Sequence, residues 1–141
     1  MVAVSPSRKF NRRVRIMIVD DHPMIRRMVR STLEQHPHFE VCDEAGDGEQ
    51  AVEKAKEIKP DVIVMNVTMP KLNGFEAARE IKKKVPQTAI VILSSNADQH
   101  FIEEAKKVGA RAYIAKSELG EGLVKAVEAA IAGEEDFIVF E

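Results

Sequence analysis

Residues 62–74 have the sequence VIVMNVTMPKLNG, in which an apolar run ends at a polar residue and a turn follows. Apolar runs of this length are typical of strands that are covered on both faces in a parallel sheet. A helix is predicted to begin at Gly74, directly after the turn. Because ligands of open α/β sheets bind at the carboxyl ends of the strands, we expect a functional site at Asn66.

Strand and helix patterns alternate on both sides of this stretch. Strands are predicted at 14–19, 39–45, 61–66, 88–94 and 110–116, and each is followed by a segment with apolar residues at helical spacing. The helices are predicted to end near Pro37, Lys59, Val85, Val108 and Gly133. This alternation predicts an α/β fold with a five-stranded parallel sheet in the flavodoxin-like order 2-1-3-4-5 and helices on both faces.

Length and composition favour one soluble domain. The 141 residues fall in the usual range for a single domain. We expect a disordered basic leader at 1–13, the domain itself at 14–133 and a C-terminal tail at 134–141. With 21 Lys and Arg against 23 Asp and Glu, the net charge of −2 gives no general case for nucleic-acid binding. The single Cys42 and the absence of an apolar run of about 20 residues predict a cytoplasmic protein that spans no membrane.

Polar side chains follow four of the predicted strands at the end where the chain leaves the sheet. Asp20 and Asp21 end the first strand, Asn66 the third, Ser94 the fourth and Lys116 the fifth. Each of them alone has an ordinary explanation as a solvated turn, a helix cap or a surface charge. In the predicted topology, however, these strand ends converge, and their joint placement favours a site.

The stretch around Asn66 resembles the phosphoacceptor segment of response-regulator receiver domains, which are CheY-like proteins of two-component signal transduction. The family pattern is an apolar strand, an Asp, two residues, Met-Pro, one residue, Leu or Met, Asp or Asn, and Gly. Every position fits here except the acceptor, which is Asn66. The GDGE loop at 46–49 also fits, and the segment AYIAKS at 112–117 resembles receivers that are joined to a helix-turn-helix output domain.

The resemblance implies a magnesium site. In a receiver, an acidic pair and the acceptor carboxylate hold Mg²⁺, which prefers hard oxygen ligands and keeps several waters. By this resemblance, Asp21, the side chain of residue 66 and the main-chain carbonyl of Thr68 would be ligands. Asp20 would act mainly through water.

The resemblance also implies a phosphoryl site and a partner. Ser94 and Lys116 would each hold a phosphoryl oxygen, and Tyr113 would be the aromatic residue that switches together with Ser94. A histidine kinase or another signalling protein would be the partner. Without phosphate on residue 66, we expect Tyr113 to sample more than one rotamer.

Asn66 changes what this site can do. The neutral amide is a poor nucleophile, so no acyl phosphate is expected, and the loss of one negative charge should weaken Mg²⁺ binding. The chain is then either a signalling receiver with an engineered block of phosphorylation, or a natural pseudo-receiver that acts as a constitutive protein-binding module. A phosphatase or flavin enzyme on the same architecture has no motif support, and no enzyme activity is predicted.

Two further features carry weaker predictions. The histidines have no metal-ligand spacing with Cys42 and are predicted to be solvated or to cap helices: His22, His36, His38 and His100. The apolar run at 137–140 is predicted to pack on its own domain or to form a short extra strand. Alternatively, it pairs with a second chain in a homodimer. Residues 134–141 are too few for a helix-turn-helix, so no nucleic-acid binding by this chain alone is expected.

Overall fold

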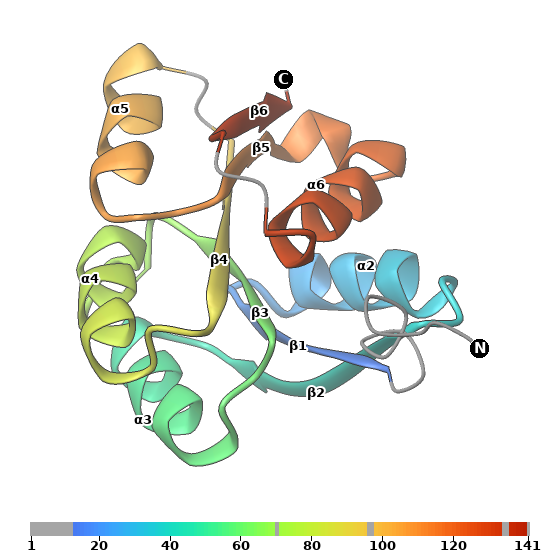
Figure 1. Cartoon of the computed structure of the whole chain (residues 1–141), viewed down its shortest axis with the longest axis horizontal. Coiled ribbons are helices and arrows are strands. Elements are labelled where there is room, and N and C mark those ends of the chain that lie inside the picture. The colour runs from blue at the N-terminus through green and yellow to red at the C-terminus, as the bar shows by residue number, and fades with distance from the viewer. Residues whose placement is uncertain (1–12, 70, 96–97, 134–135, 141) are drawn as a thin grey trace.

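The computed structural model describes residues 13–69, 71–95, 98–133 and 136–140, and nearly all of the predicted leader lies outside these residues (Figure 1). One parallel sheet with the strand order β2-β1-β3-β4-β5-β6 forms the centre. The predicted order 2-1-3-4-5 is therefore confirmed for the first five strands. The strands are β1 (Val14–Val19), β2 (Phe39–Ala45), β3 (Val62–Asn66), β4 (Ala89–Ser94), β5 (Ala112–Ala115) and β6 (Ile138–Phe140).

The prediction of a five-stranded sheet is wrong by one strand, because the C-terminal apolar run forms β6. This strand pairs in parallel with β5, and the Ile138 N–H donates to the Arg111 carbonyl at 3.2 Å. Phe137 and Phe140 pack against the cores on opposite faces of the sheet. The burial of these side chains at the otherwise open edge of β5 explains why the run pairs within its own chain.

Helices cover both faces of the sheet (Figure 1). On one face lie α3 (Gly48–Ile58), α4 (Gly74–Lys84) and α5 (Gln99–Lys107), and on the other lie α2 (Pro23–Glu34) and α6 (Glu121–Ile131). A short 3₁₀ helix, η1 (Lys116–Glu118), precedes α6, so the last helix begins later than its apolar pattern suggests. Within the described ranges, no helix is long and apolar enough to cross a membrane.

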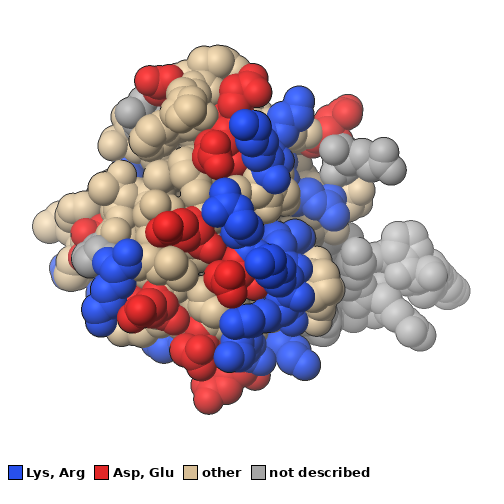
Figure 2. All heavy atoms as spheres, turned by 90° about the vertical axis from the view of Figure 1, so that its left-hand side faces the viewer, with Lys and Arg blue, Asp and Glu red and all other residues tan. Residues whose placement is uncertain are grey.

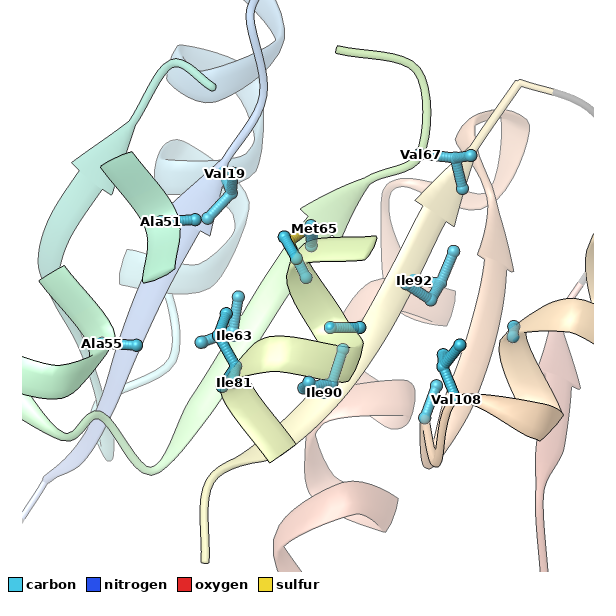
Figure 3. Close-up of a cluster of buried hydrophobic side chains, with 14 of the residues drawn as sticks. Val19, Ala51, Ala55, Ile63, Met65, Val67, Ile81, Ile90, Ile92 and Val108 are labelled. Atoms are coloured by element: carbon cyan, nitrogen blue, oxygen red, sulfur yellow. The ribbon is translucent and has the colours of Figure 1, made fainter. Parts of the chain in front are cut away.

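The central strands are buried on both faces, as their continuous apolar sequences predict. All residues of β3 and β4 are buried. Figure 3 shows Ile63 and Ile90 of these strands next to Ile81 of α4 in one of the two cores. Side chains of opposite parity in the same strands, such as Val64 and Val91, belong to the other core. The sheet thus holds the strand ends in fixed positions.

The turn after β3 depends on a close backbone contact. The Gly74 N–H donates to the Val67 carbonyl at 2.7 Å, and a Cβ at Gly74 would lie 2.2 Å from the carbonyl oxygen of Asn66. Only glycine fits there without a shift of the backbone. Asn73 then caps α4 in a reciprocal capping box with Glu76. This turn fixes the end of β3 and with it the position of residue 66.

Charge on the face formed by α3, α4 and α5 is arranged along the helices. Figure 2 shows a band of Lys and Arg side chains over this face with Asp and Glu side chains beside it. Acidic residues lie in the first turns of α3 and α4, where they complement the positive end of the helix dipole. Basic residues occupy the last turns: Lys56, Lys82, Lys83, Lys84, Lys106 and Lys107.

Candidate functional site

The ends of β1, β3, β4 and β5 meet at one edge of the sheet, as the topology predicts. There they enclose an open hollow of about 430 Å³. The strand-end residues Asp21, Asn66, Ser94 and Lys116 all line it. The lining is completed by His22, Thr68, Ser95 and Phe101. The structure therefore brings together residues that are up to 95 positions apart in the chain (116 − 21).

Asn66 is buried, and its amide group is engaged by its neighbours. The side chain is 4 % exposed. Its Nδ2 donates to the Thr68 carbonyl at 2.8 Å and, through a longer contact of 3.4 Å, to Asp21 Oδ1. The amide hydrogens therefore point at two of the oxygens that the sequence predicts as Mg²⁺ ligands. A carboxylate at this position has no hydrogen to offer either oxygen.

Asp20 is the most deeply buried charged group of the site, with a relative exposure of 1 %. Its Oδ1 accepts a hydrogen bond from the His22 backbone N–H at 2.9 Å. Its Oδ2 has no hydrogen-bond partner among the described residues, although Lys116 Nζ lies 3.4 Å away. At this distance the ammonium attracts the carboxylate without forming a well-aligned hydrogen bond. One oxygen of Asp20 thus keeps an unused acceptor capacity inside the site.

His22 belongs to the site, which the sequence reasoning missed. It is exposed and precedes α2 at the N-cap position, as the prediction of a solvated or capping residue implies. Its Nδ1, however, lies 3.0 Å from Asp20 Oδ1 and 3.2 Å from Asp21 Oδ1. Asp20, Asp21 and His22 each offer a ligand atom within 4.8 Å of the others. The signal available in the sequence was the adjacency of His22 to the acidic pair in a tight strand-to-helix turn.

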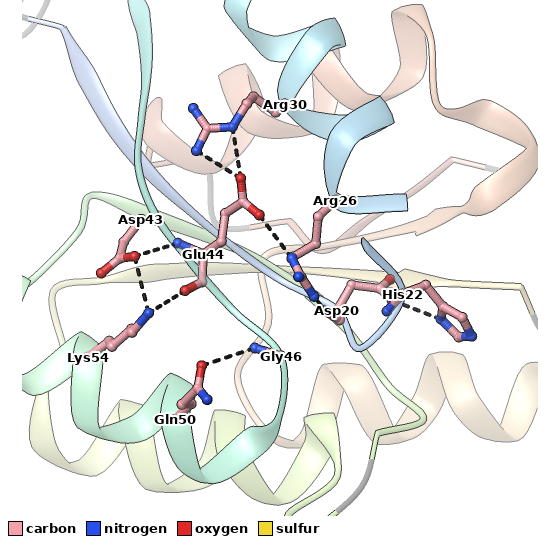
Figure 4. A network of polar contacts seen from close by, with 9 residues as sticks. All are labelled: Asp20, His22, Arg26, Arg30, Asp43, Glu44, Gly46, Gln50 and Lys54. Carbon is pink, nitrogen blue, oxygen red and sulfur yellow. Dashed lines mark hydrogen bonds and ion pairs between the residues drawn. The ribbon is translucent and has the colours of Figure 1, made fainter. Parts of the chain in front are cut away.

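An ionic network behind the site links β2 and α2 to the end of β1 (Figure 4). Arg26 donates through Nη1 to the carbonyl of Asp20 and through Nε to Glu44 Oε1 at 2.9 Å. Arg30 binds the other oxygen of Glu44 at 2.8 Å. Burial alone raises the pKa of Glu44, but the hydrogen bonds from Arg30 and Arg26 outweigh it, and the pKa lies below the ordinary value. Glu44 is therefore held as a carboxylate, and Arg26 ties it to the backbone of the site.

Ser94 and Tyr113, the predicted switch pair, are both buried. Ser94 is 3 % exposed and Tyr113 is fully buried in the core beneath α4 and α5. Tyr113 takes this buried position in a chain that has an amide, and not a carboxylate, at residue 66. The role of this pair as a switch and the exchange of Tyr113 between rotamers stay predictions.

Comparison with known proteins agrees with this geometry. A family model described as the response regulator receiver domain matches residues 16–128. The transcriptional regulatory protein DegU of Brevibacillus brevis is 36 % identical over 121 residues, which cover 86 % of this chain and 51 % of that protein. The chemotaxis protein CheY of Thermotoga maritima is 41 % identical over 102 residues, or 72 % of this chain and 84 % of that one.

Solved structures show the same fold. The response regulator domain of Thermotoga maritima CheB has a TM-score of 0.80 at 32 % identity and covers 87 % of this chain and 99 % of that domain. The receiver domain of a NarL regulator from Mycobacterium tuberculosis has a TM-score of 0.83 at 28 % identity, with coverage of 87 % and 99 %. The chain spans about half the length of the full-length transcriptional regulators that it matches, at 51 % and 57 % in two cases.

Proposed function

The chain belongs to the response regulator receiver domain family, and we propose that it is a receiver that accepts no phosphoryl group because Asn66 stands at the acceptor position. The observation that carries the proposal is the place of Asn66 at the end of β3, inside the hollow formed by the four strand ends. Phosphorylation of a receiver requires a carboxylate oxygen to attack phosphorus. The amide of Asn66 lacks that nucleophile and is occupied by Thr68 and Asp21.

Receiver domains bind Mg²⁺ at an acidic pocket, and the donors of this chain fit a weakened version of such a site. Asp20, Asp21 and the carbonyl of Thr68 supply hard oxygens, and one oxygen of Asp20 has no hydrogen bond. Asn66 can supply its carbonyl oxygen only after its amide turns away from Asp21 and Thr68. Because the site also lacks one carboxylate charge, we propose that Mg²⁺ binds more weakly here than to the Asn66→Asp variant.

The places of Ser94 and Lys116 support a phosphoryl site in this hollow. Both line the hollow next to Asn66, and Lys116 is drawn toward Asp20. We propose that they hold a phosphoryl group in a variant with Asp at position 66. In the present chain they are retained without that task, which is consistent with loss of the acceptor from a site that is otherwise complete.

Receiver domains interact with histidine kinases. We propose that this chain, as the receiver of residues 14–133, docks such a kinase or another signalling protein without receiving phosphate. Relatives such as DegU are transcriptional regulators about twice as long as the matched region, so we propose an output domain in the same regulator. A cytoplasmic location would keep Cys42 reduced.

A second candidate function is that of a constitutive protein-binding module. It is supported by the burial of Tyr113 and by the amide contacts of Asn66, which are both present in a chain without an acceptor carboxylate. This candidate predicts that partners bind the unmodified chain as tightly as they bind phosphorylated Asn66→Asp. A receiver that only lost its acceptor would bind them more weakly than the phosphorylated variant.

Intact-mass spectrometry after incubation with acetyl phosphate and Mg²⁺ tests the proposal. The unaltered chain should keep its mass, and Asn66→Asp should gain one labile phosphoryl group. The double variant Asn66→Asp, Lys116→Ala is the control, because it restores the carboxylate and removes the ammonium that lines the same hollow. A phosphoryl adduct on residue 66 of the unaltered chain would overturn the proposal.

A further inference from the structure

Strand β6 changes the surroundings of Tyr113. In the register of the sheet, Tyr113 lies between Ile92 of β4 and Val139 of β6. Neighbouring strands are about 4.8 Å apart, and paired residues of parallel strands project to the same face. Val139 therefore stands directly beside Tyr113 on the face that α4 and α5 cover. In a sheet that ended at β5, this neighbouring position would be open.

Contacts on both faces fasten β6 in this place. Phe137 packs against the core that contains Tyr113, whereas Phe140 packs against the opposite core beside α6. The backbone is joined to β5 through Ile138 and Arg111. Val139 itself remains 37 % exposed at the outer border of the sheet. It is therefore the neighbours of Val139 in the chain that hold it against Tyr113.

We propose that β6 keeps Tyr113 in its buried position, so that the C-terminal strand sets the conformation of this residue instead of the chemistry at residue 66. A side chain on an edge strand can rotate past the edge into solvent, whereas one on an internal strand meets its neighbour in that direction. Val139 fills the space into which the Tyr113 ring would otherwise turn. The proposal rests on the proposed function in one respect, namely that Asn66 supplies no phosphoryl signal of its own.

The same geometry indicates how Tyr113 would leave its buried position. Strand β6 has only three residues and contributes no charged contact among the described residues, so it opens more easily than the central strands. Withdrawal of β6 turns β5 into an edge strand and frees Tyr113. An extended apolar segment of a partner that replaces β6 at the β5 edge keeps Tyr113 buried. The C-terminal segment thereby takes the place of phosphorylation as the input to the switch.

The chain offers a direct probe, because it contains one Tyr and no Trp. Intrinsic fluorescence therefore reports on Tyr113 alone, and acrylamide quenching measures its exposure. The full chain should be quenched weakly. A chain that ends at Gly133 should show a quenching constant several-fold higher, with the far-UV circular dichroism of a folded α/β domain. A folded truncated chain with unchanged quenching would overturn the proposal.

Two substitutions at Ile138 test the same point in the full-length chain. Ile138→Pro removes the N–H that donates to Arg111 and should raise the quenching constant to near that of the truncated chain. Ile138→Ala is the matched control, since it shortens the same side chain but keeps this N–H and leaves Val139 in place, and it should leave quenching near that of the unaltered chain. Equal quenching by both variants at the level of the unaltered chain would contradict the proposal, even if the truncated chain fails to fold.

Phosphorylation separates this proposal from the proposed function. In full-length Asn66→Asp, acetyl phosphate and Mg²⁺ should leave quenching unchanged, because β6 already holds Tyr113 buried. In truncated Asn66→Asp, the same treatment should lower it. If the mass test shows phosphate on Asn66, the proposed function fails, while the effect of truncation in the absence of acetyl phosphate still decides the role of β6.

Discussion

The two edges of the sheet are built in different ways. The strand β2 has seven residues, carries the acidic side chains Asp43 and Glu44, and pairs with β1 through a register shift between Ile16 and Met17. Strand β6 has three residues and no charged side chain. Charges and irregular pairing protect a long edge strand from other chains, whereas shortness alone protects an apolar one. One edge is thus stabilised by ion pairs and the other by apolar contacts.

Each edge is also connected to different predicted site residues. Through Arg26, the β2 edge is tied to the carbonyl of Asp20 and so to the acidic pair. The β6 edge lies beside Tyr113 at the opposite side of the sheet. Perturbing the charged edge should therefore alter the binding of cations and the pH dependence of the free energy of unfolding. Perturbing the apolar edge should alter the exposure of Tyr113 and leave the acidic pair in place.

Removal of β6 should have the largest effect on stability. Truncation after Gly133 exposes the apolar surface that Phe137 and Phe140 cover. After the entropy gained by the freed residues is subtracted, the free energy of unfolding should fall by about 2 kcal/mol. Urea denaturation measures this, and Ile138→Pro should show a similar loss without any change in charge. An unchanged midpoint in both would mean that β6 contributes nothing to the apolar edge.

The substitution Glu44→Gln should break the charged edge. It leaves Arg26 and Arg30 without their carboxylate, but all three groups are partly solvated, so we expect a loss of about 1.5 kcal/mol. Glu40→Gln is the matched control, because Glu40 is exposed on the same strand and has no ion pair among the described residues. Urea melts of the two variants should differ clearly. Equal effects would mean that the ion pairs of Glu44 add nothing at this edge.

The sequence predicts features that have a local pattern, but it does not predict contacts between distant residues. Continuous apolar runs and strand-end polar residues are local patterns, so the first five strands and the meeting of Asp21, Asn66, Ser94 and Lys116 could be predicted. The ion pairs of Glu44 join α2 to β2 across 14 and 18 positions without any local signature. The apolar tail was ambiguous, because an exposed strand edge can be covered from within the chain or by another chain.

The substitution Asn66→Asp serves to test whether the two edges are coupled to the site in the free energy of unfolding. In Asn66→Asp a carboxylate faces the Thr68 carbonyl and Asp21, where the amide now donates hydrogen bonds. In EDTA at neutral pH, we expect this repulsion to cost about 1 kcal/mol, and added Mg²⁺ should narrow the difference. Urea melts with and without Mg²⁺ measure it.

Double variants complete that test. Asn66→Asp should couple to Glu44→Gln, because Glu44 is linked to the carbonyl of Asp20 through Arg26 and residue 66 contacts the adjacent Asp21. It should be additive with truncation after Gly133, whose contacts lie at the other edge. Additivity in both combinations would show that Glu44 is not energetically coupled to residue 66.

The smallest expected effect is the change with pH in the free energy of unfolding that the charged edge contributes. It should be less than about 1 kcal/mol, because Glu44 and its arginines are partly solvated. The pKa of Glu44 is lower in the folded chain than its ordinary value, since the hydrogen bonds from Arg30 and Arg26 outweigh the effect of burial. A depressed carboxyl pKa contributes stability above the unfolded value of about 4.3, and this contribution is lost as the pH falls through the folded value. The stability gap between the unaltered chain and Glu44→Gln should therefore be full at neutral pH and shrink below about pH 4.3.

The gap to Ile138→Pro should stay constant over the same range, because residues 137–140 contain no titratable side chain. Urea melts of the three proteins from pH 7 downward would measure both gaps, and a gap to Glu44→Gln that is constant with pH would show that Glu44 is not held as a carboxylate by its arginines.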